Sequence, residues 1–214
     1  MREERIFFPS TGIKLEGLIH KSEAPLARGG VILCHPHPQF GGDMDNPVIH
    51  SGIHAAHEAG FSTLRFNFRG VGESEGAYAE GIGEKEDVRA AVDCLNAIFG
   101  DRDHSIVLLG YSFGAWVGLP VAIQDERVKA MAAIAPPLAM FDFGFLKGCK
   151  KNKLIITGSR DLYCPIPLLE KWYSTLEEPK SLKLIEGSDH FFFSHHQSLI
   201  PPLSEFFRDV IEYG

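Results

Sequence analysis

Residues Ser105-Ile-Val-Leu-Leu-Gly-Tyr-Ser-Phe-Gly114 run from an unbroken apolar segment into a serine that has a glycine two positions away on each side. An apolar pattern with helical spacing, Phe113 to Ile123, begins at once. The stretch predicts a buried strand, a sharp turn and a helix, because glycine tolerates a tight backbone and close packing. Ser112 then lies at the tip of the turn with its hydroxyl facing the solvent-side cleft. It is a candidate nucleophile, and its alternative role is a helix N-cap.

The rest of the chain alternates short apolar runs with helix-like segments. We expect strands at Arg5 to Phe8, Ile13 to His20, Gly30 to Cys34, Ser62 to Phe68, Ser105 to Leu109, Val128 to Ala135, Lys153 to Thr157 and Leu182 to Ile185. We expect helices at Val48 to Glu58, Glu84 to Phe99, Phe113 to Ile123, Pro165 to Leu176 and Leu199 to Ile211. The first two strands are joined by a turn too short for a crossover, so they should form an antiparallel hairpin. The remainder is typical of βαβ units and predicts a single α/β domain over residues 1–214. Its sheet should be mostly parallel and doubly wound, with about eight strands and helices on both faces.

The composition argues against several classes of partner. The 214 residues are 44% hydrophobic and 23% charged, which is enough for one sizeable core. A formal net charge of −7 opposes binding to nucleic acid and to anionic membranes. No apolar run approaches the roughly 20 residues that a bilayer requires. The four cysteines lack C-x-x-C spacing and the N-terminus lacks a secretory pattern, so we expect reduced thiols and a cytoplasmic location.

A second stretch, Gly72-Glu-Ser-Glu-Gly76, has the same glycine and serine spacing. It lies four residues past its expected strand, no apolar helix begins at it, and two glutamates flank the serine. Those carboxylates would oppose the negative charge that develops on oxygen during acyl transfer. We therefore expect Ser112, and not Ser74, to be the nucleophile.

A histidine base is expected near the end of the chain, because sheets with a serine at such a turn carry the triad in the order serine, acid, histidine. His190 follows the last expected strand through the flexible turn Glu186-Gly-Ser-Asp-His190. His195 and His196 are expected at the surface. His190 would then take the proton of Ser112, and its alternative role is that of a solvated loop residue.

Asp161 is the candidate acid. It follows the strand Lys153 to Thr157 at the carboxyl end, where a partner for His190 should stand. Asp142 is the second candidate, whereas Asp189 is adjacent to His190 in sequence and poorly placed to reach its Nδ1. The alternative role of Asp161 is that of a turn or capping residue.

Two backbone N–H groups are expected to form an oxyanion hole. One belongs to Phe113, directly after the nucleophile, and the other must come from the loop after the third strand. Pro36 and Pro38 have no N–H group, so His37 is the candidate donor, held rigidly by its two proline neighbours. Metal binding by His35 and His37 is the competing interpretation. It is not favoured, because no carboxylate or cysteine nearby completes a ligand pattern.

Three stretches resemble the small, lidless bacterial α/β-hydrolases: His35-Pro-His-Pro-Gln-Phe-Gly-Gly42, Leu64-Arg-Phe-Asn-Phe-Arg-Gly-Val-Gly-Glu-Ser74 and Gly110-Tyr-Ser-Phe-Gly114. The resemblance runs from about residue 14 to the C-terminus. It implies an activity of the esterase or thioesterase type, related to dienelactone hydrolases and to serine peptidases of the same fold. The residues that match the family motifs position by position are Ser112, Asp161, His190 and Phe113.

Two positions depart from the family pattern. Larger α/β-hydrolases carry His-Gly where this chain has His35-Pro36, which leaves the second oxyanion donor open. Pro120 lies inside the helix expected after Ser112, where a proline should kink it.

Aromatic residues near the expected site predict a substrate pocket lined by Tyr111, Phe113, Phe141 and Phe143. Only about sixteen residues separate the sixth and seventh strands, too few for a helical cap. The alternating residues Phe141, Phe143 and Phe145 can form a short flap over an acyl pocket, and core packing is the equal alternative.

Other features predict no cofactor and no metal. His50, His54 and His57 share one face of an expected helix and fit a polar, partly exposed surface. The glycine-rich stretch Arg69-Gly-Val-Gly72 is too short for a phosphate site and lacks a following helix start.

The favoured function is a serine hydrolase that cleaves esters or thioesters of a small acyl substrate through an acyl-enzyme. One alternative is a serine peptidase or amidase of the same fold. The other is a noncatalytic binding module.

Overall fold

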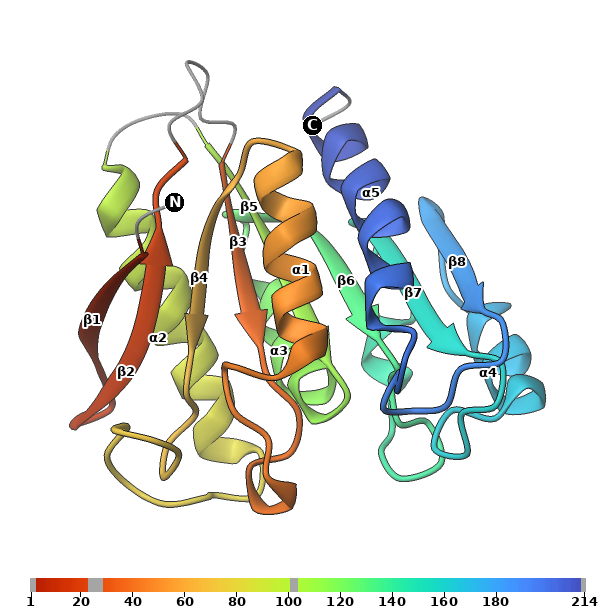
Figure 1. Ribbon diagram of the computed structural model, residues 1–214, viewed down its shortest axis with the longest axis horizontal. Helices are drawn as coiled ribbons and strands as arrows, with labels where there is room; N and C mark the ends of the chain where they lie inside the picture. The colour runs from red at the N-terminus through yellow and green to blue at the C-terminus, as the bar shows by residue number, and fades with distance from the viewer. Residues whose placement is uncertain (1–2, 23–28, 101–103, 213–214) are drawn as a thin grey trace.

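Eight strands form one hydrogen-bonded sheet in the computed structural model, which describes residues 3–22, 29–100 and 104–212 (Figure 1). They are β1 (Glu3–Ser10), β2 (Ile13–His20), β3 (Gly29–Cys34), β4 (Ser62–Phe66), β5 (Ser105–Tyr111), β6 (Val128–Ile134), β7 (Asn152–Gly158) and β8 (Lys180–Ile185). Their order across the sheet is β1-β2-β4-β3-β5-β6-β7-β8. The pairs β1/β2 and β2/β4 are antiparallel, and all the others are parallel. This topology confirms the predicted doubly wound, mostly parallel sheet with an antiparallel hairpin at its start.

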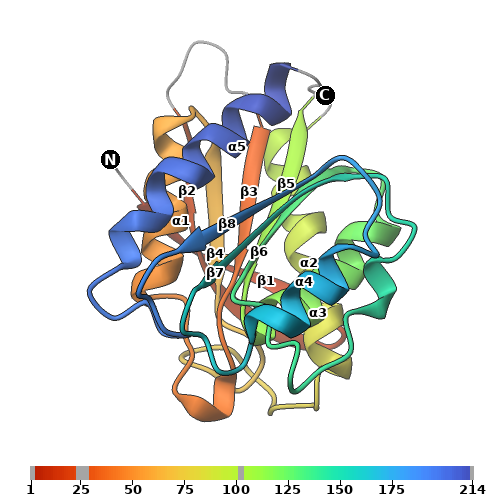
Figure 2. The same ribbon diagram turned by 90° about the vertical axis from the view of Figure 1, so that its right-hand side faces the viewer.

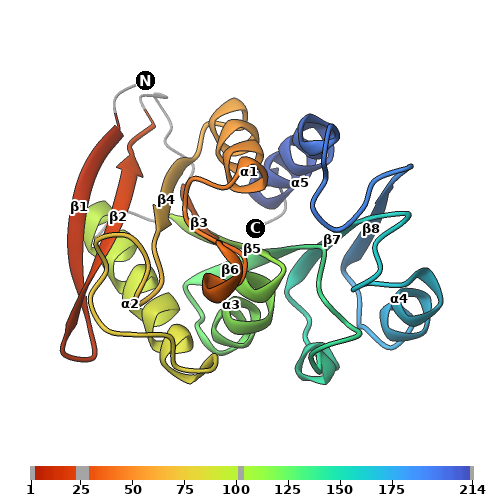
Figure 3. The ribbon, with the colours of Figure 1, turned by 60° about the horizontal axis from the view of Figure 1, so that its bottom comes forward.

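Helices cover both faces of the sheet. The α-helices of the described residues are α1 (Pro47–Glu58), α2 (Ile82–Phe99), α3 (Phe113–Gln124), α4 (Ile166–Tyr173) and α5 (Ile200–Glu212), and short 3-10 helices lie at Pro38–Phe40, Gly144–Leu146 and His196–Leu199. α1 and α5 lie on one face, and α2, α3 and α4 lie on the other (Figure 3). Val31 and Leu33 of β3 belong to the core beneath α1 and α5, whereas Ile32 and Cys34 belong to the core beneath α2 and α3. This alternation explains why the strand is apolar throughout. α3 continues through Pro120, so that residue does not end the helix.

Two elements end at least two residues earlier than the sequence predicts. β4 ends at Phe66, because the N–H group of Phe68 donates to the buried imidazole of His35 at 3.0 Å and not to a neighbouring strand. α4 ends at Tyr173, because the N–H group of Leu176 bonds only three residues back, to the Tyr173 carbonyl, in the tighter 3-10 pattern. Both differences come from hydrogen bonds that apolar periodicity does not report.

The parallel strands end at one edge of the sheet, at the bottom of Figure 1. The sheet twists, so that β8 is strongly rotated against β3 (Figure 2). The loops after β3, β5, β6, β7 and β8 follow the carboxyl ends of their strands, where open α/β sheets form their ligand sites. In the described part of the chain, no helix has both the length and the apolar content needed to span a bilayer.

Candidate active site

Ser112 lies at the sharp turn between β5 and α3, with φ of 53° and ψ of −116°. A Cβ atom on Gly114 would stand 2.1 Å from the Cys34 carbonyl oxygen, and one on Gly110 would stand 2.5 Å from the Ala115 backbone. Close backbone packing therefore requires both glycines, as the sequence predicts. The left-handed φ at a serine is strain that the surrounding structure maintains, and such strain is typical of functional positions.

Three residues from three different loops form a continuous hydrogen-bonded chain. Ser112 Oγ lies 3.0 Å from His190 Nε2, and His190 Nδ1 lies 2.8 Å from Asp161 Oδ2. All three side chains are buried. Because the Asp161 carboxylate accepts a hydrogen bond from the Nδ1–H group, Nε2 is free to accept the serine proton. The arrangement can deprotonate a serine hydroxyl and return the proton to a leaving group.

The Asp161 carboxylate is held by four donors. Oδ2 accepts hydrogen bonds from Thr157 Oγ1 at 3.1 Å and from the imidazole of His190. Oδ1 accepts the backbone N–H groups of Tyr163 and Cys164 at 2.8 and 3.0 Å. Both oxygens are therefore satisfied within the fold, which fixes the orientation of the carboxylate toward the histidine.

Tyr111 anchors the loop that carries the histidine. Its hydroxyl donates to the His190 carbonyl oxygen at 3.1 Å. Burial raises the pKa of the Tyr111 hydroxyl, and the charges of Asp161 and Asp189 raise it further. The phenol therefore stays protonated and keeps donating this bond at neutral pH.

The loop after β3 is fastened by a buried histidine. Nε2 of His35 accepts the Phe68 N–H at 3.0 Å, and Nδ1 donates to the Pro36 carbonyl at 2.7 Å. A backbone N–H can only donate, so the imidazole is neutral with a fixed tautomer, and burial lowers its pKa to about 4. Both ring nitrogens are used in this way, which leaves neither for a metal ion. The next histidine, His37, has its ring 4.7 Å from that of Phe113, and both residues line one cavity.

This cavity, of about 360 Å³, opens over the candidate nucleophile. Its lining includes the predicted residues Tyr111, Phe113 and Phe141. It also includes Tyr163 and Phe191, which were not predicted from the sequence. Each of these two lies within two residues of a candidate triad member, and that adjacency is the signal that could have found them.

Phe143 is not part of the cavity lining, so its predicted role in the pocket was wrong. Its side chain is only 2% exposed and packs edge-on against Trp172, with ring centroids 5.9 Å apart. Phe141 lines the cavity and stacks on Trp116, with centroids 4.2 Å and ring planes 15° apart. Residues 135–151 contain one three-residue 3-10 helix and no helical cap over the site.

Comparison with known proteins identifies the family. The family model described as alpha/beta hydrolase fold matches residues 31–148, which is more than half of the chain. The chain belongs to the α/β-hydrolase fold family. An uncharacterized protein of Rickettsia prowazekii is 33% identical to this hydrolase over 196 residues, which cover 88% of this chain and 82% of the relative.

Solved structures support the same assignment. An alpha-beta serine hydrolase homologue from Coxiella burnetii is 31% identical, with a TM-score of 0.88 over 96% of this chain and 97% of that chain. A serine hydrolase without lid from Xanthomonas campestris is 28% identical, with a TM-score of 0.88 over 100% and 97% of the two chains. An esterase of Pyrococcus furiosus, 17% identical with a TM-score of 0.84 over 98% and 93%, shares the fold. The predicted resemblance to small lidless bacterial α/β-hydrolases is confirmed.

The second serine motif of this hydrolase is structural. Ser74 is buried, its Oγ donates to the Asn67 carbonyl at 2.7 Å, and the same atom accepts the Glu16 N–H at 2.9 Å. The hydroxyl therefore ties the loop after β4 to β2.

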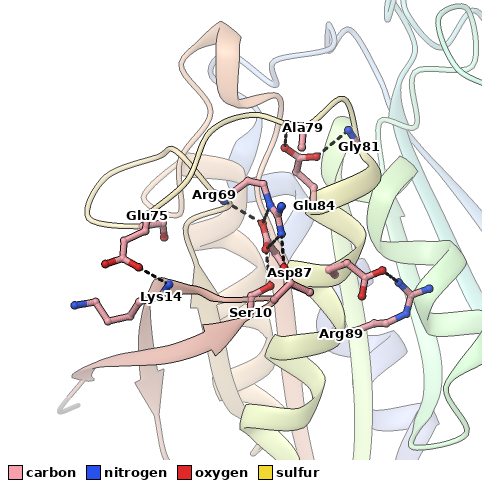
Figure 4. Close-up of polar contacts among 12 residues, drawn as sticks. Ser10, Lys14, Arg69, Glu75, Ala79, Gly81, Glu84, Asp87 and Arg89 are labelled. Carbon is pink, nitrogen blue, oxygen red and sulfur yellow. Dashed lines mark hydrogen bonds and ion pairs between the residues drawn. The ribbon is translucent and has the colours of Figure 1, made fainter.

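Arg69 fastens the same loop to α2, as Figure 4 shows. Its Nη2 donates to Asp87 Oδ1 at 2.7 Å, and its Nε and backbone N–H donate to Asp87 Oδ2 at 3.0 Å. Ser10 Oγ adds a hydrogen bond to Asp87 at 2.8 Å, and Glu84 accepts the Gly81 N–H at 2.8 Å. The bonds to Asp87 raise the pKa of Arg69. These contacts explain the glycine-rich stretch after Arg69 as a structural turn.

The other candidate acids make local contacts. Asp142 Oδ1 accepts the Gly144 N–H at 2.7 Å, and Asp189 Oδ1 accepts the N–H groups of Phe191 and Phe193 at 3.1 and 3.4 Å. Both carboxylates shape turns, whereas Asp161 is the one bonded to the catalytic candidate histidine.

The three histidines of α1 make separate contacts: His50 with Asp45, His54 with Glu58 and His57 with Thr63. In the part of the chain that the structure describes, no group of three or more histidine, cysteine or acidic side chains could hold a metal ion.

Proposed function

We propose that this protein is a serine hydrolase that cleaves carboxylic esters or thioesters through an acyl-enzyme. The hydrogen-bonded chain from Asp161 through His190 to Ser112, which ends at an apolar-walled cavity, carries the proposal. Membership of the α/β-hydrolase fold family supports hydrolysis as the reaction class. The experiment below distinguishes this function from its two alternatives, a peptidase of the same fold and a noncatalytic binding module.

Ser112 Oγ attacks the substrate carbonyl carbon while His190 Nε2 takes its proton. The Asp161 carboxylate holds the Nδ1 proton and stabilises the imidazolium that forms. The tetrahedral adduct collapses, the bond to the alcohol or thiol breaks, and the leaving group takes the proton from Nε2. Water then attacks the acyl-enzyme through the same steps, which releases the acid and restores the serine.

The backbone N–H groups of Phe113 and His37 are the proposed oxyanion donors. Their residues flank the cavity from α3 and from the loop after β3. This loop is supported on both sides, since His35 bonds to the Pro36 carbonyl and a Cβ on Gly42 would stand 2.2 Å from the same oxygen. Such packing provides the rigid donor placement that oxyanion stabilisation requires.

The acyl part of the substrate is proposed to be small. Phe141 is held in place by its stack on Trp116, and residues 135–151 form no helical cap above the cavity. We therefore expect kcat/KM to peak at short acyl chains, with no activation at a lipid interface. We further propose that the chain works as one catalytic domain, since its strands share one sheet. Its free cysteines favour a reducing cytoplasmic setting.

A substrate panel tests the function. Acetyl, butyryl, octanoyl and dodecanoyl esters, the matching thioesters, and aminoacyl amides are assayed with the wild type, with Ser112→Ala as the blank. The proposal expects turnover of short esters or thioesters that Ser112→Ala removes. Faster turnover of amides than of esters indicates a peptidase, and a folded protein that turns over nothing indicates a binding module. A rate jump on emulsified long-chain esters would show a mobile cover over the site.

A further inference from the structure

An aromatic shelf, which we define as Tyr163, Phe191 and Phe193, extends from the candidate histidine into solvent. The rings of Tyr163 and Phe191 lie 4.7 and 5.4 Å from the His190 imidazole, and Phe193 continues the row 5.7 Å from Phe191. The three side chains are 39%, 52% and 72% exposed. Apolar surface gathered in this way beside a cavity is typical of a binding site.

The turn that contains Phe191 and Phe193 holds their rings at the surface. Phe192, between the two exposed phenylalanines, is fully buried, with its ring 6.3 Å from that of Tyr111. Its φ is 55°, a conformation that a bulky residue rarely adopts. The Asp189 carboxylate accepts the N–H groups of Phe191 and Phe193 and so closes the turn. Burial of the middle ring therefore directs its two neighbours outward.

The direction of proton transfer indicates which part of a substrate meets the shelf. In the proposed reaction, the leaving oxygen or sulfur takes its proton from His190 Nε2, so the departing group must lie beside the imidazole. Of the three cavity rings paired with this imidazole, those of Tyr163 and Phe191 lie nearer than that of Tyr111, whose centroid is 5.9 Å away. Phe141, which lines the same cavity, stacks on Trp116. The cavity thus has two different aromatic walls.

We infer that the aromatic shelf is the leaving-group subsite, and that the substrate class is esters or thioesters of a small acid with an arylalkyl alcohol or thiol. This inference rests on the proposed function. Flat rings fit the shelf because aromatic pairs combine buried apolar area with favourable edge and face contacts. The shelf is open to solvent, so it selects for an apolar group without limiting its length.

Steady-state kinetics on acetate esters test the inference. Methyl acetate and 2-phenylethyl acetate share one acyl group and have alcohols of similar acidity, so their intrinsic reactivity is similar. We expect kcat/KM for the phenylethyl ester to exceed that for the methyl ester by about tenfold, the effect of burying one ring. Phe191→Ala should reduce this ratio by about fivefold, and Phe191→Leu should reduce it less.

Two controls separate recognition from a structural effect. Phe40→Ala removes an exposed ring that lines the same cavity beside His37, and it should leave the ratio between the two esters unchanged. Deacetylation of Ser112, followed by rapid quench and intact-protein mass spectrometry, should have the same rate in the wild type and in Phe191→Ala. The alcohol has already departed at that step.

The outcomes are distinct. Equal kcat/KM for the methyl and phenylethyl esters in an active wild type would overturn the inference and leave the proposed function standing. Slower deacetylation in Phe191→Ala, matching the loss in acylation, would also overturn it, because the ring would then act by positioning His190. Absence of any ester turnover in the folded wild type would overturn the proposed function and the inference together.

Discussion

Ser112 and Ser74 occupy the same sequence pattern, yet their hydroxyl groups face different surroundings. Ser112 follows β5 with a left-handed φ, and its Oγ faces His190 at the mouth of a cavity. Ser74 Oγ is bonded to the backbone of Asn67 and Glu16 within a buried loop. One hydroxyl is available for chemistry, and the other holds two segments of chain together.

The glycine and serine spacing alone therefore does not identify a nucleophile, because the backbone around the serine decides where its hydroxyl lies. Around Ser112, the motif glycines allow contacts in which a Cβ would stand 2.1 Å from the Cys34 carbonyl oxygen. Around Ser74, an added Cβ would meet side-chain atoms: Ile13 at 3.1 Å and Arg69 at 3.5 Å for Gly76, and Asn67 at 2.4 Å and Glu16 at 2.7 Å for Gly72. The first turn is packed against the sheet, and the second is held by hydrogen bonds of its loop.

Ser112→Ala should reduce activity, whereas Ser74→Ala should reduce stability. Ser112→Ala is expected to lower kcat for ester hydrolysis by on the order of 10⁶, because the covalent route is lost. Ser74→Ala should leave kcat nearly unchanged but lower the free energy of unfolding by about 1–3 kcal/mol, because buried backbone groups lose a partner. Kinetics and urea unfolding of both variants measure this. An inactive Ser74→Ala that unfolds like the wild type would contradict the comparison.

Asp161→Asn should lower kcat by on the order of 10⁴, because the amide presents the histidine with the wrong hydrogen-bond pattern. Asp142→Asn and Asp189→Asn are the matched controls, since their carboxylates bond to turn N–H groups. They should retain most of the activity. Equal losses in Asp161→Asn and Asp142→Asn would mean that the acid is assigned wrongly.

Gly114, from the Ser112 motif, and Gly76, from the Ser74 motif, should differ in their tolerance of an added methyl group. Gly114→Ala is expected to destabilise the fold by about 3 kcal/mol, because the new Cβ meets a backbone oxygen that cannot move freely. Gly76→Ala, at φ of 84°, should cost only about 1–2 kcal/mol of backbone strain. Thermal and urea unfolding report both values. A Gly76→Ala variant less stable than Gly114→Ala would refute the packing argument.

His35 connects the loop after β3 to the loop after β4, which contains Ser74. Protonation of its imidazole at acidic pH should weaken this connection. Burial lowers its pKa to about 4, so between pH 6.5 and 4 the unfolded chain binds a proton on this residue that the folded protein does not. The free energy of unfolding should therefore fall as the pH falls through this window, by up to about 1.4 kcal/mol per pH unit. His35→Gln should reduce this slope and also slow ester hydrolysis.

His57 provides the control for this titration. Burial also lowers its pKa to about 4, but it lies on α1, where it bonds to Thr63. His57→Gln should reduce the slope of stability against pH and leave ester hydrolysis unchanged. An unchanged slope in His35→Gln would contradict the neutral, buried imidazole on which the loop depends.

Much of the architecture could be predicted from apolar periodicity, because strands buried on both faces need continuous apolar runs. The turn at Ser112 was predictable for a similar reason, since only glycine fits its close contacts. The cavity walls were harder to predict. Phe141 and Phe143 alternate in sequence, but their loop folds one ring onto Trp116 and the other against Trp172. Phe191 is exposed because its neighbour is buried, which depends on tertiary packing and on a positive φ.

Labelling with a fluorophosphonate, followed by peptide mapping, distinguishes the two serines, because the reagent reports which serine hydroxyl is activated in the folded protein. We expect one phosphonate per chain, on the peptide that contains Ser112, with none on Ser74 and with slower labelling in Asp161→Asn. A phosphonate on Ser74, or no adduct on the folded wild type, would contradict it.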